Sequence, residues 1–192
     1  VGPAPYSGDW WANSADDGQI RGCYFDDHFV FNADGSFQNV LGDETWLEWW
    51  QGVDADQCGI PVYPHDGSNP AIWDFNEETG QITLTGMGAY VGLPKAVNAG
   101  ELPNVDVPES VTYNVSFDNG MMTLVIEAGA GVFWTFDLVP ALDGEAVYFV
   151  KEDYADVTNP ENWDHVTESV AIMRGDNQGL YNPYVEDSYN GL

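Results

Sequence analysis

The fold is indicated most clearly by the stretch Val111-Thr-Tyr-Asn-Val-Ser-Phe117, which is followed by Asp118-Asn119-Gly120 and by Met121 to Glu127. Apolar residues occupy every second position from Val111 to Phe117, with polar residues between them. Such alternation predicts a β-strand with one buried face. Asn119-Gly120 favours a tight turn because both residues tolerate positive φ angles. The stretch therefore predicts an antiparallel hairpin.

The same hairpin pattern occurs twice more along the chain. Tyr24 to Phe31 turns at Asn32-Ala-Asp-Gly35 into Ser36 to Leu41, and Ala71 to Phe75 turns at Asn76-Glu-Glu-Thr-Gly80 into Gln81 to Thr85. In all three hairpins a Phe is followed directly by Asn or Asp where the turn begins. Further strands are predicted at Trp46 to Trp50, Met87 to Val91, Val132 to Val139, Ala146 to Lys151 and Ser169 to Arg174.

The absence of a convincing helical pattern makes the predicted fold all-β. The 21 Gly and 11 Pro residues are spread through the chain, and no capped run keeps a 3.6-residue period. We expect either an antiparallel β-sandwich of the jelly-roll type or an up-and-down, lipocalin-like barrel with long loops. Period-two alternation does not separate these two architectures.

Long irregular segments and a change in composition suggest how the chain is organised. Loops are predicted at Gln51 to Asn69, Gly92 to Pro108 and Asp153 to His165, and loops of this length are usually either functional or disordered. We expect a β module over residues 1–140. Residues 141–192 are expected to pack on that module or to lead into a further domain. The chain opens at Val1 without a leader, so we expect a removed signal peptide or a fragment.

Charge excludes several classes of partner. The 192 residues carry 32 Asp and Glu against 4 Lys and Arg, for a net charge of −28. Nucleic-acid binding needs cations that neutralise phosphates, and anionic membrane surfaces would repel this chain. No run approaches the roughly 20 apolar residues that cross a bilayer. Because 44% of the residues are hydrophobic, the chain can still form a core.

The composition and the cysteines indicate an extracellular location. We expect a secreted or cell-surface protein, either one from a saline habitat, such as that of a halophilic marine bacterium, or an ordinary acidic extracellular protein. Cys23 and Cys58 are the only cysteines. We expect them to form one disulfide, with two free buried thiols as the alternative.

Tryptophan is more abundant than a small β core requires. Five of the 8 Trp residues fall in two clusters, Trp10-Trp11 and Trp46, Trp49 and Trp50. Adjacent strand residues point to opposite faces, so in each Trp-Trp pair one ring would lie outside the core. Exposed rings beside amides and acids are typical of sugar-binding sites, which makes Trp11, Trp49 and Trp50 candidate contacts. The alternative is that a loop or an oligomer contact covers these rings.

Polar and aromatic loop residues complete the predicted binding surface. His65 and Asp66 lie in a long loop, where they would bind a hydroxyl group or a metal, or where Asp66 would simply cap its own turn. Lys95 lies within the loop Gly92 to Asn98, which carries no other charge and follows closely after Tyr90. Lys95 is therefore a candidate binding residue, whereas the other cations are expected to form local ion pairs. Trp73 and Trp134 alternate with apolar neighbours and are predicted to lie in the core.

Calcium is a candidate ligand because carboxylates are abundant. The segment from Asp54 begins like an EF-hand loop but has Cys58 at its fifth position and His65 at its twelfth, which excludes an EF-hand. A different calcium site built from Asp26, Asp27, Asp54 or Asp56 remains an expectation. No Cys or His spacing suggests zinc.

The residues favour a binding protein over an enzyme. A glycosidase needs two carboxyl groups about 5–9.5 Å apart. Glu44 and Glu48 would lie about 13 Å apart along one strand, at roughly 3.3 Å per residue. Hydrolysis therefore ranks below binding as a hypothesis.

Several segments together resemble a known kind of domain. They are Gly8 to Trp11, Cys23 to Asp27, Phe31 to Phe37, Thr45 to Gly52, Pro64 to Ser68 and Gly131 to Trp134. They resemble a non-catalytic β-rich module of large secreted proteins of marine bacteria, often found beside family 16 glycoside hydrolases. The Phe31 to Phe37 hairpin also resembles lipocalin-like barrels. The catalytic motif of family 16 is absent, so the resemblance does not imply that activity.

The sequence as a whole predicts a carbohydrate-binding module for a neutral polysaccharide such as a β-glucan. A polyanionic ligand would be repelled by the surface charge. The first alternative is a structural or adhesive subunit of an extracellular assembly, in which self-association or neighbouring domains involve the C-terminal tail. The second alternative is a glycoside hydrolase.

Overall fold

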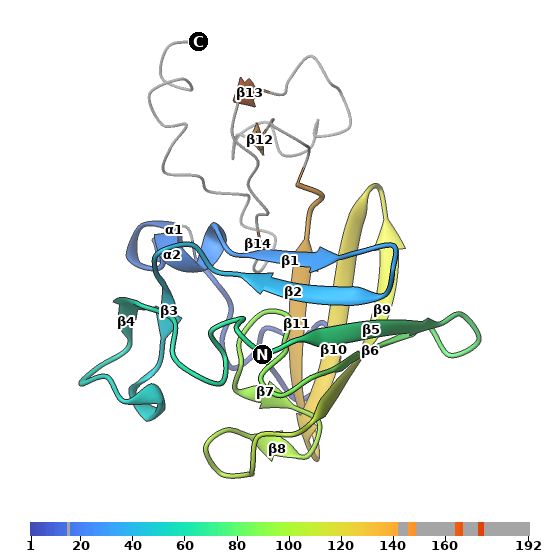
Figure 1. The fold of residues 1–192 in the computed structure, drawn as a ribbon, viewed down its shortest axis with the longest axis horizontal. Coiled ribbons are helices and arrows are strands. Elements are labelled where there is room, and N and C mark those ends of the chain that lie inside the picture. Colours follow the sequence, from blue (N-terminus) through green and yellow to red (C-terminus); the bar gives the residue numbers. More distant parts are fainter. Residues whose placement is uncertain (15, 142–145, 149–163, 167–172, 175–192) are drawn as a thin grey trace.

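The protein is one strongly curled antiparallel sheet with loops packed into its concave side (Figure 1). The computed structural model describes residues 1–14, 16–141, 146–148, 164–166 and 173–174. Neighbouring strands follow the order β1-β2-β5-β6-β9-β10-β11, with β14 added beside β11. The sheet strands are β1 (His28–Phe31), β2 (Ser36–Val40), β5 (Ala71–Asn76), β6 (Gln81–Thr85), β9 (Ser110–Asp118), β10 (Met121–Gly129), β11 (Val132–Leu138) and β14 (Met173–Arg174).

Short elements make up the remainder of the described secondary structure. Two-stranded pairs are formed by β3 (Thr45–Leu47) with β4 (Gln57–Gly59), β7 (Ala96–Val97) with β8 (Gly100–Glu101), and β12 (Ala146–Tyr148) with β13 (Asp164–Val166). The helices are α1 (Asp17–Ile20), α2 (Gly22–Phe25) and the 3₁₀ turn η1 (Trp49–Gln51). Among the described residues, no helix is long and apolar enough to cross a membrane.

The all-β prediction is confirmed, and the sheet is an open half-barrel. In the central hairpin, Val115 pairs with Leu124 and Phe117 with Met122, as the alternation and the Asn119-Gly120 turn require. Within β1 to β11 the other sheets are only two-stranded pairs, so the second large sheet of a sandwich is missing from this part of the chain. The curled sheet is therefore closer to the barrel alternative, although β1 and β11 do not pair to close it.

Strand registers place three tight turns at one end of the half-barrel and two long connections at the other. The β1–β2, β5–β6 and β9–β10 turns share one end, which we call the hairpin end. Connections 41–70 and 86–109 leave from the opposite end, called here the loop end. Figure 1 shows the hairpin turns on the side away from β3 and β4.

The concave side of the sheet is filled by side chains. Leu84, Tyr113 and Leu124 are fully buried there. Connection 86–109 packs onto them, and the Tyr113 hydroxyl accepts a hydrogen bond from the backbone N–H of Val91 at 3.0 Å. Gly92 has φ 78°, and a Cβ at this position would collide with the ring of Phe136. The glycine therefore allows the loop to approach the sheet closely.

Three predicted strands differ from the structure. The segment Tyr24 to Phe31 begins as α2 and becomes a strand only at His28. Trp46 to Trp50 is divided between β3 and η1 because Gly52, at φ 93°, ends a tight turn there. Met87 to Val91 is a loop rather than a strand and is buried from Gly88 onward, since Gly86 and Gly88 have positive φ angles and turn the chain inward. Residues 153–163 of the predicted loop Asp153 to His165 and most of the extension 141–192 lie outside the described residues, and the last two residues of that predicted loop belong to strand β13.

Candidate functional site

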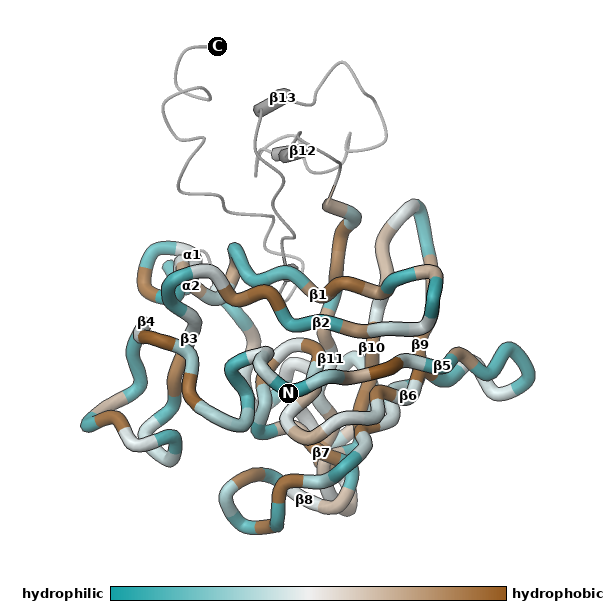
Figure 2. Tube along the Cα trace, in the orientation of Figure 1, coloured by the Kyte–Doolittle hydropathy of each residue, from teal (hydrophilic) through white to brown (hydrophobic). Residues whose placement is uncertain are grey.

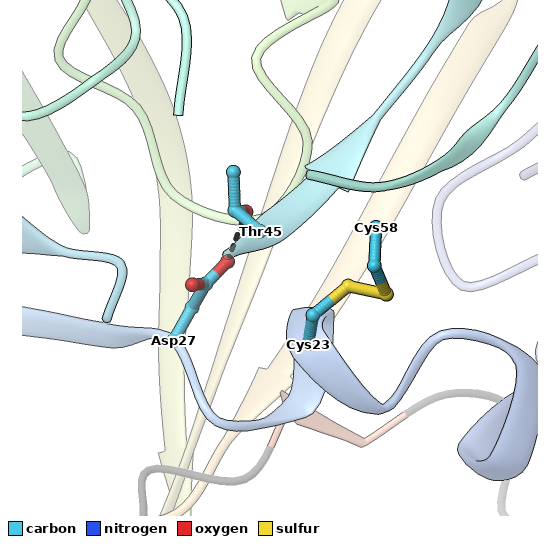
Figure 3. The surroundings of a disulfide bond; sticks show 4 residues. All are labelled: Cys23, Asp27, Thr45 and Cys58. Atoms are coloured by element: carbon cyan, nitrogen blue, oxygen red, sulfur yellow. Dashed lines mark hydrogen bonds between the residues drawn. A yellow bond between two sulfur atoms is a disulfide. The ribbon is translucent and has the colours of Figure 1, made fainter. Parts of the chain in front are cut away.

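The predicted disulfide is present and fixes the base of the loop end. Cys23 in α2 and Cys58 in β4 are bonded, with their Cα atoms 5.9 Å apart (Figure 3). The bridge joins the helical segment to the β3–β4 pair, which carries η1 at its tip. The tip is therefore tied to the rest of the domain by a covalent bond as well as by packing.

Trp49 is displayed at this tip with its indole in solvent. Its side chain is 63% exposed, although its backbone N–H donates to Asp56 Oδ1 at 2.9 Å. The Glu48 N–H donates to the Gln51 side-chain oxygen at 3.0 Å and closes the turn from the other side. The backbone beneath the exposed ring is thus held by hydrogen bonds at both flanks.

Trp50, the other member of the pair, points inward. Its Nε1–H donates to Glu48 Oε2 at 2.9 Å, and its ring meets the edge of His65 at a centroid distance of 5.7 Å. The rule that adjacent rings take opposite directions therefore holds here, although on a 3₁₀ turn rather than a strand. Trp49 provides the free ring and Trp50 anchors the turn.

His65 and Tyr90 lie beneath Trp50 rather than at the surface. They are 5% and 3% exposed, and their rings contact each other edge to face at 6.0 Å. Burial lowers the pKa of His65 to about 4, so the imidazole is neutral at physiological pH. Both residues were predicted as ligand contacts, and their burial makes them supports of the Trp50 ring.

Lys95 forms an ion pair within the molecule. Its ammonium pairs with Glu48 Oε1 and lies 5.0 Å from the centre of the Trp134 ring. The Trp134 Nε1–H donates in turn to Glu101 Oε1 at 2.6 Å. The sequence placed Lys95 in a loop without other charges, but its partner comes from a segment 47 residues away. Glu48 thereby connects η1 to the loop 86–109.

Trp11 and Asp66 also have structural partners. The Arg21 guanidinium lies between the rings of Trp11 and Trp46, 4.7 and 4.5 Å from their centres, so Trp11 is half-buried. Asp66 Oδ1 accepts hydrogen bonds from the Ser68 N–H at 3.1 Å and from its hydroxyl at 2.6 Å. These bonds lower the pKa of Asp66. They form the self-capped turn that the sequence offered as the alternative to a ligand-binding role for Asp66.

The four candidate calcium ligands are not gathered into one site. Within the described part of the chain, no three His, Cys, Asp or Glu side chains form a group that could hold a metal ion. Asp56 accepts a hydrogen bond from the backbone N–H of Trp49. Asp27 accepts a hydrogen bond from the Thr45 hydroxyl at 2.7 Å (Figure 3). Asp54 is exposed and Asp26 is half-buried. The structure therefore gives the calcium hypothesis no assembled ligand set.

Sequence reasoning did not single out three exposed apolar residues in the two long connections, 41–70 and 86–109. Ile60, Tyr63 and Met87 are 78%, 62% and 45% exposed, and the Tyr63 hydroxyl donates to Met87 Sδ at 3.7 Å. A cavity of about 10 Å³, enough for one water molecule, lies beside Met87 and Asn69. The sequence signal for this surface was Tyr63 in the predicted loop Gln51 to Asn69, from which only His65 and Asp66 were predicted as ligand contacts.

Comparison with known proteins did not identify a family. No protein-family model matches the sequence, no curated protein matches it, and no solved structure matches the fold. The resemblance to modules of marine secreted proteins therefore extends only to a β-rich domain. What the chain shows by itself is a curled antiparallel half-barrel with a disulfide-anchored tryptophan at its loop end.

Proposed function

We propose that the protein binds a neutral polysaccharide at its loop end, with Trp49 as the principal contact. The observation that carries this proposal is an indole 63% exposed on a turn that is hydrogen-bonded on both flanks. A large ring left in water gains nothing from folding, but it provides a rigid apolar surface for a partner. Because the turn is already ordered, binding would require little further loss of backbone freedom.

Carbohydrate is the ligand class that fits an isolated ring among acids and amides. The face of an indole packs against the C–H groups of a pyranose, while neighbouring carboxylates and amides hydrogen-bond its hydroxyls. Asp54, Asp56 and Gln51 provide such groups on the same tip. Exposed Tyr63 offers a second ring in the same long connection, 41–70. The surface thus has the components of a sugar-binding platform.

Charge restricts the proposed ligand to neutral glycans. The chain has a net charge of −28, and the side chains of Arg21 and Lys95 are both held by internal partners. A sulfated or uronic polysaccharide would meet repulsion at the tip, where Asp54 and Asp56 are exposed. The disulfide supports a secreted or cell-surface location, where such polysaccharides occur.

Isothermal titration with soluble β-glucans and other neutral glycans tests the proposal. Trp49→Ala should weaken binding at least about tenfold, because central aromatic contacts dominate such surfaces. Trp10→Ala is the matched control, since Trp10 is 57% exposed but lies in the N-terminal segment. Binding that responds equally to both substitutions, or a folded protein that binds none of the glycans, contradicts the proposal.

A further inference from the structure

The hairpin end carries an apolar surface that the proposed glycan site does not use. The three Phe residues that precede the turns, Phe31, Phe75 and Phe117, pair across their strands with Phe37, Ile82 and Met122. Phe37 and Ile82 are 2% exposed on the concave side. Because directly paired residues share one face of a sheet, the three Phe side chains face the concave side as well.

Exposure of these side chains increases toward the turns. Leu84 and Tyr113, deeper in the half-barrel, are fully buried, whereas Phe75 is 37% and Phe117 is 65% exposed. The Phe75 and Phe117 rings contact each other edge to face at 6.4 Å. With their partly buried neighbours they form one surface, called here the hairpin-end patch: Phe31, Trp73, Phe75, Val115, Phe117 and Met122.

The patch can receive a partner only from outside. Leu84, Tyr113 and Leu124 fill the space beneath it, so the half-barrel has no room for a ligand held within the sheet at this level. Phe75 and Phe117 are therefore an open surface rather than the wall of a cavity. Contiguous exposed rings of this kind mark interaction surfaces.

Acidic residues surround the patch at the three turns. Asp34, Glu77, Glu78 and Asp118 are all exposed there. Residues 28–40, 71–85 and 110–129, which form the three hairpins, contain no Lys or Arg. Figure 2 shows the hydrophilic tip of the β5–β6 hairpin beyond the hydrophobic part of β5. An apolar centre with an acidic rim is complementary to a segment that is apolar on one side and positively charged around it.

We propose that the hairpin-end patch docks a cationic amphipathic peptide segment of a partner protein, whose apolar side chains cover Phe75 and Phe117 while its Lys or Arg residues meet the acidic turns. A second copy of this chain fits poorly because it would bring the same acidic turns against each other. The docking surface lies at the end of the half-barrel opposite Trp49, so it is independent of the glycan site.

Titration of the full chain with synthetic peptides tests the charge and apolar requirements. The probe is a short peptide of Leu, Phe and Lys, compared with one in which Glu replaces Lys and one in which Ser replaces Leu and Phe. We expect binding of the first alone, weakening as NaCl rises from about 50 to about 500 mM. Equal binding of the Lys and Glu peptides, or no binding of the Lys peptide, overturns the proposal.

Substitutions locate the binding surface. Phe117→Ala should weaken binding of the Lys peptide at least about tenfold. Glu77→Gln combined with Glu78→Gln should make the binding affinity less dependent on salt. Ile72→Ala is the control, because Ile72 is 59% exposed but lies on the opposite face of β5 from Phe75. Trp49→Ala should leave peptide binding unchanged. A loss with Ile72→Ala or Trp49→Ala equal to that with Phe117→Ala overturns the assignment.

Photo-crosslinking identifies the occupant directly. Phe117→p-benzoylphenylalanine places a reactive ketone at the most exposed position of the patch. Irradiation with the Lys peptide should give a peptide adduct, read by mass spectrometry. A crosslink to residues 142–192 of the same chain that persists with the peptide, or a crosslinked dimer, shows another occupant and overturns the proposal.

Discussion

Asp27 is a buried carboxyl group whose protonation should control the pH dependence of folding. Its side chain is 2% exposed, Oδ2 accepts a hydrogen bond from Thr45, and Oδ1 has no partner. Burial raises the pKa of Asp27 to about 9. Between about pH 4 and about pH 9 Asp27 therefore retains a proton in the folded protein that it releases in the unfolded chain, so the contribution of Asp27 to stability falls as pH rises through this range.

The substitution Asp27→Asn isolates this effect. Asn cannot ionise and keeps an oxygen that can accept the Thr45 hydrogen bond, but it places an unpaired NH₂ where Oδ1 lies, which costs about 1–3 kcal/mol. Ionisation of Asp27 costs the wild-type protein up to ~1.4 kcal/mol per pH unit, an upper limit of ~5 kcal/mol between about pH 4 and about pH 8. The variant should therefore be less stable than wild type near pH 4 and more stable near pH 8.

Urea unfolding followed by tryptophan fluorescence at several pH values measures the difference. Repulsion among the other carboxylates is common to both proteins and cancels in the comparison. Asp34→Asn is the control: hydrogen bonds from Ser36 lower the pKa of Asp34, so this carboxyl is ionised in both the folded and the unfolded protein above about pH 4, and the gap between this variant and wild type should stay nearly constant from about pH 4 to about pH 8. A gap between Asp27→Asn and wild type that stays constant from about pH 4 to about pH 8 would refute the reasoning.

Three further predictions concern the loop end and the sheet. Cys23→Ala should lower the free energy of unfolding by about 3–4 kcal/mol, because the bridge spans 35 residues; urea unfolding measures this. Lys95→Met leaves the Glu48 carboxylate without its cation and should cost ~3 kcal/mol, mostly recovered by adding Glu48→Gln. Gly88→Ala would push a Cβ into a backbone carbonyl and should prevent folding, whereas Gly120→Ala, with open space around it, should cost only about 1–2 kcal/mol in a thermal melt.

Local patterns predicted the hairpins because their determinants lie within a few residues. Alternation from Val111 and the Asn119-Gly120 turn fix the β9–β10 register without help from the rest of the chain. Met87 to Val91 was mispredicted because its apolar residues are buried by a loop that turns inward at Gly88, not by a strand. Apolar spacing alone does not distinguish these two forms of burial.

The candidate site was only partly accessible to sequence reasoning. The pattern predicted that one ring of a Trp-Trp pair would be free, but it could not choose between Trp49 and Trp50. That choice depends on Glu48, which holds Trp50 and also pairs with Lys95 from 47 residues away. Long-range partners of this kind also explain why the sequence left Lys95 unpaired.

The two long connections share the loop end only with the short β10–β11 turn, and their separation from the other three turns lets each end of the domain change independently. Connections 41–70 and 86–109 join strands only at the loop end, while the acidic turns and the Phe residues belong to the other end. Segments of different length could therefore be spliced in at Trp49 without shifting any paired residue of the hairpins. Such a layout makes the half-barrel a natural frame for protein engineering, in which recognition at one pole is diversified while the opposite pole stays constant.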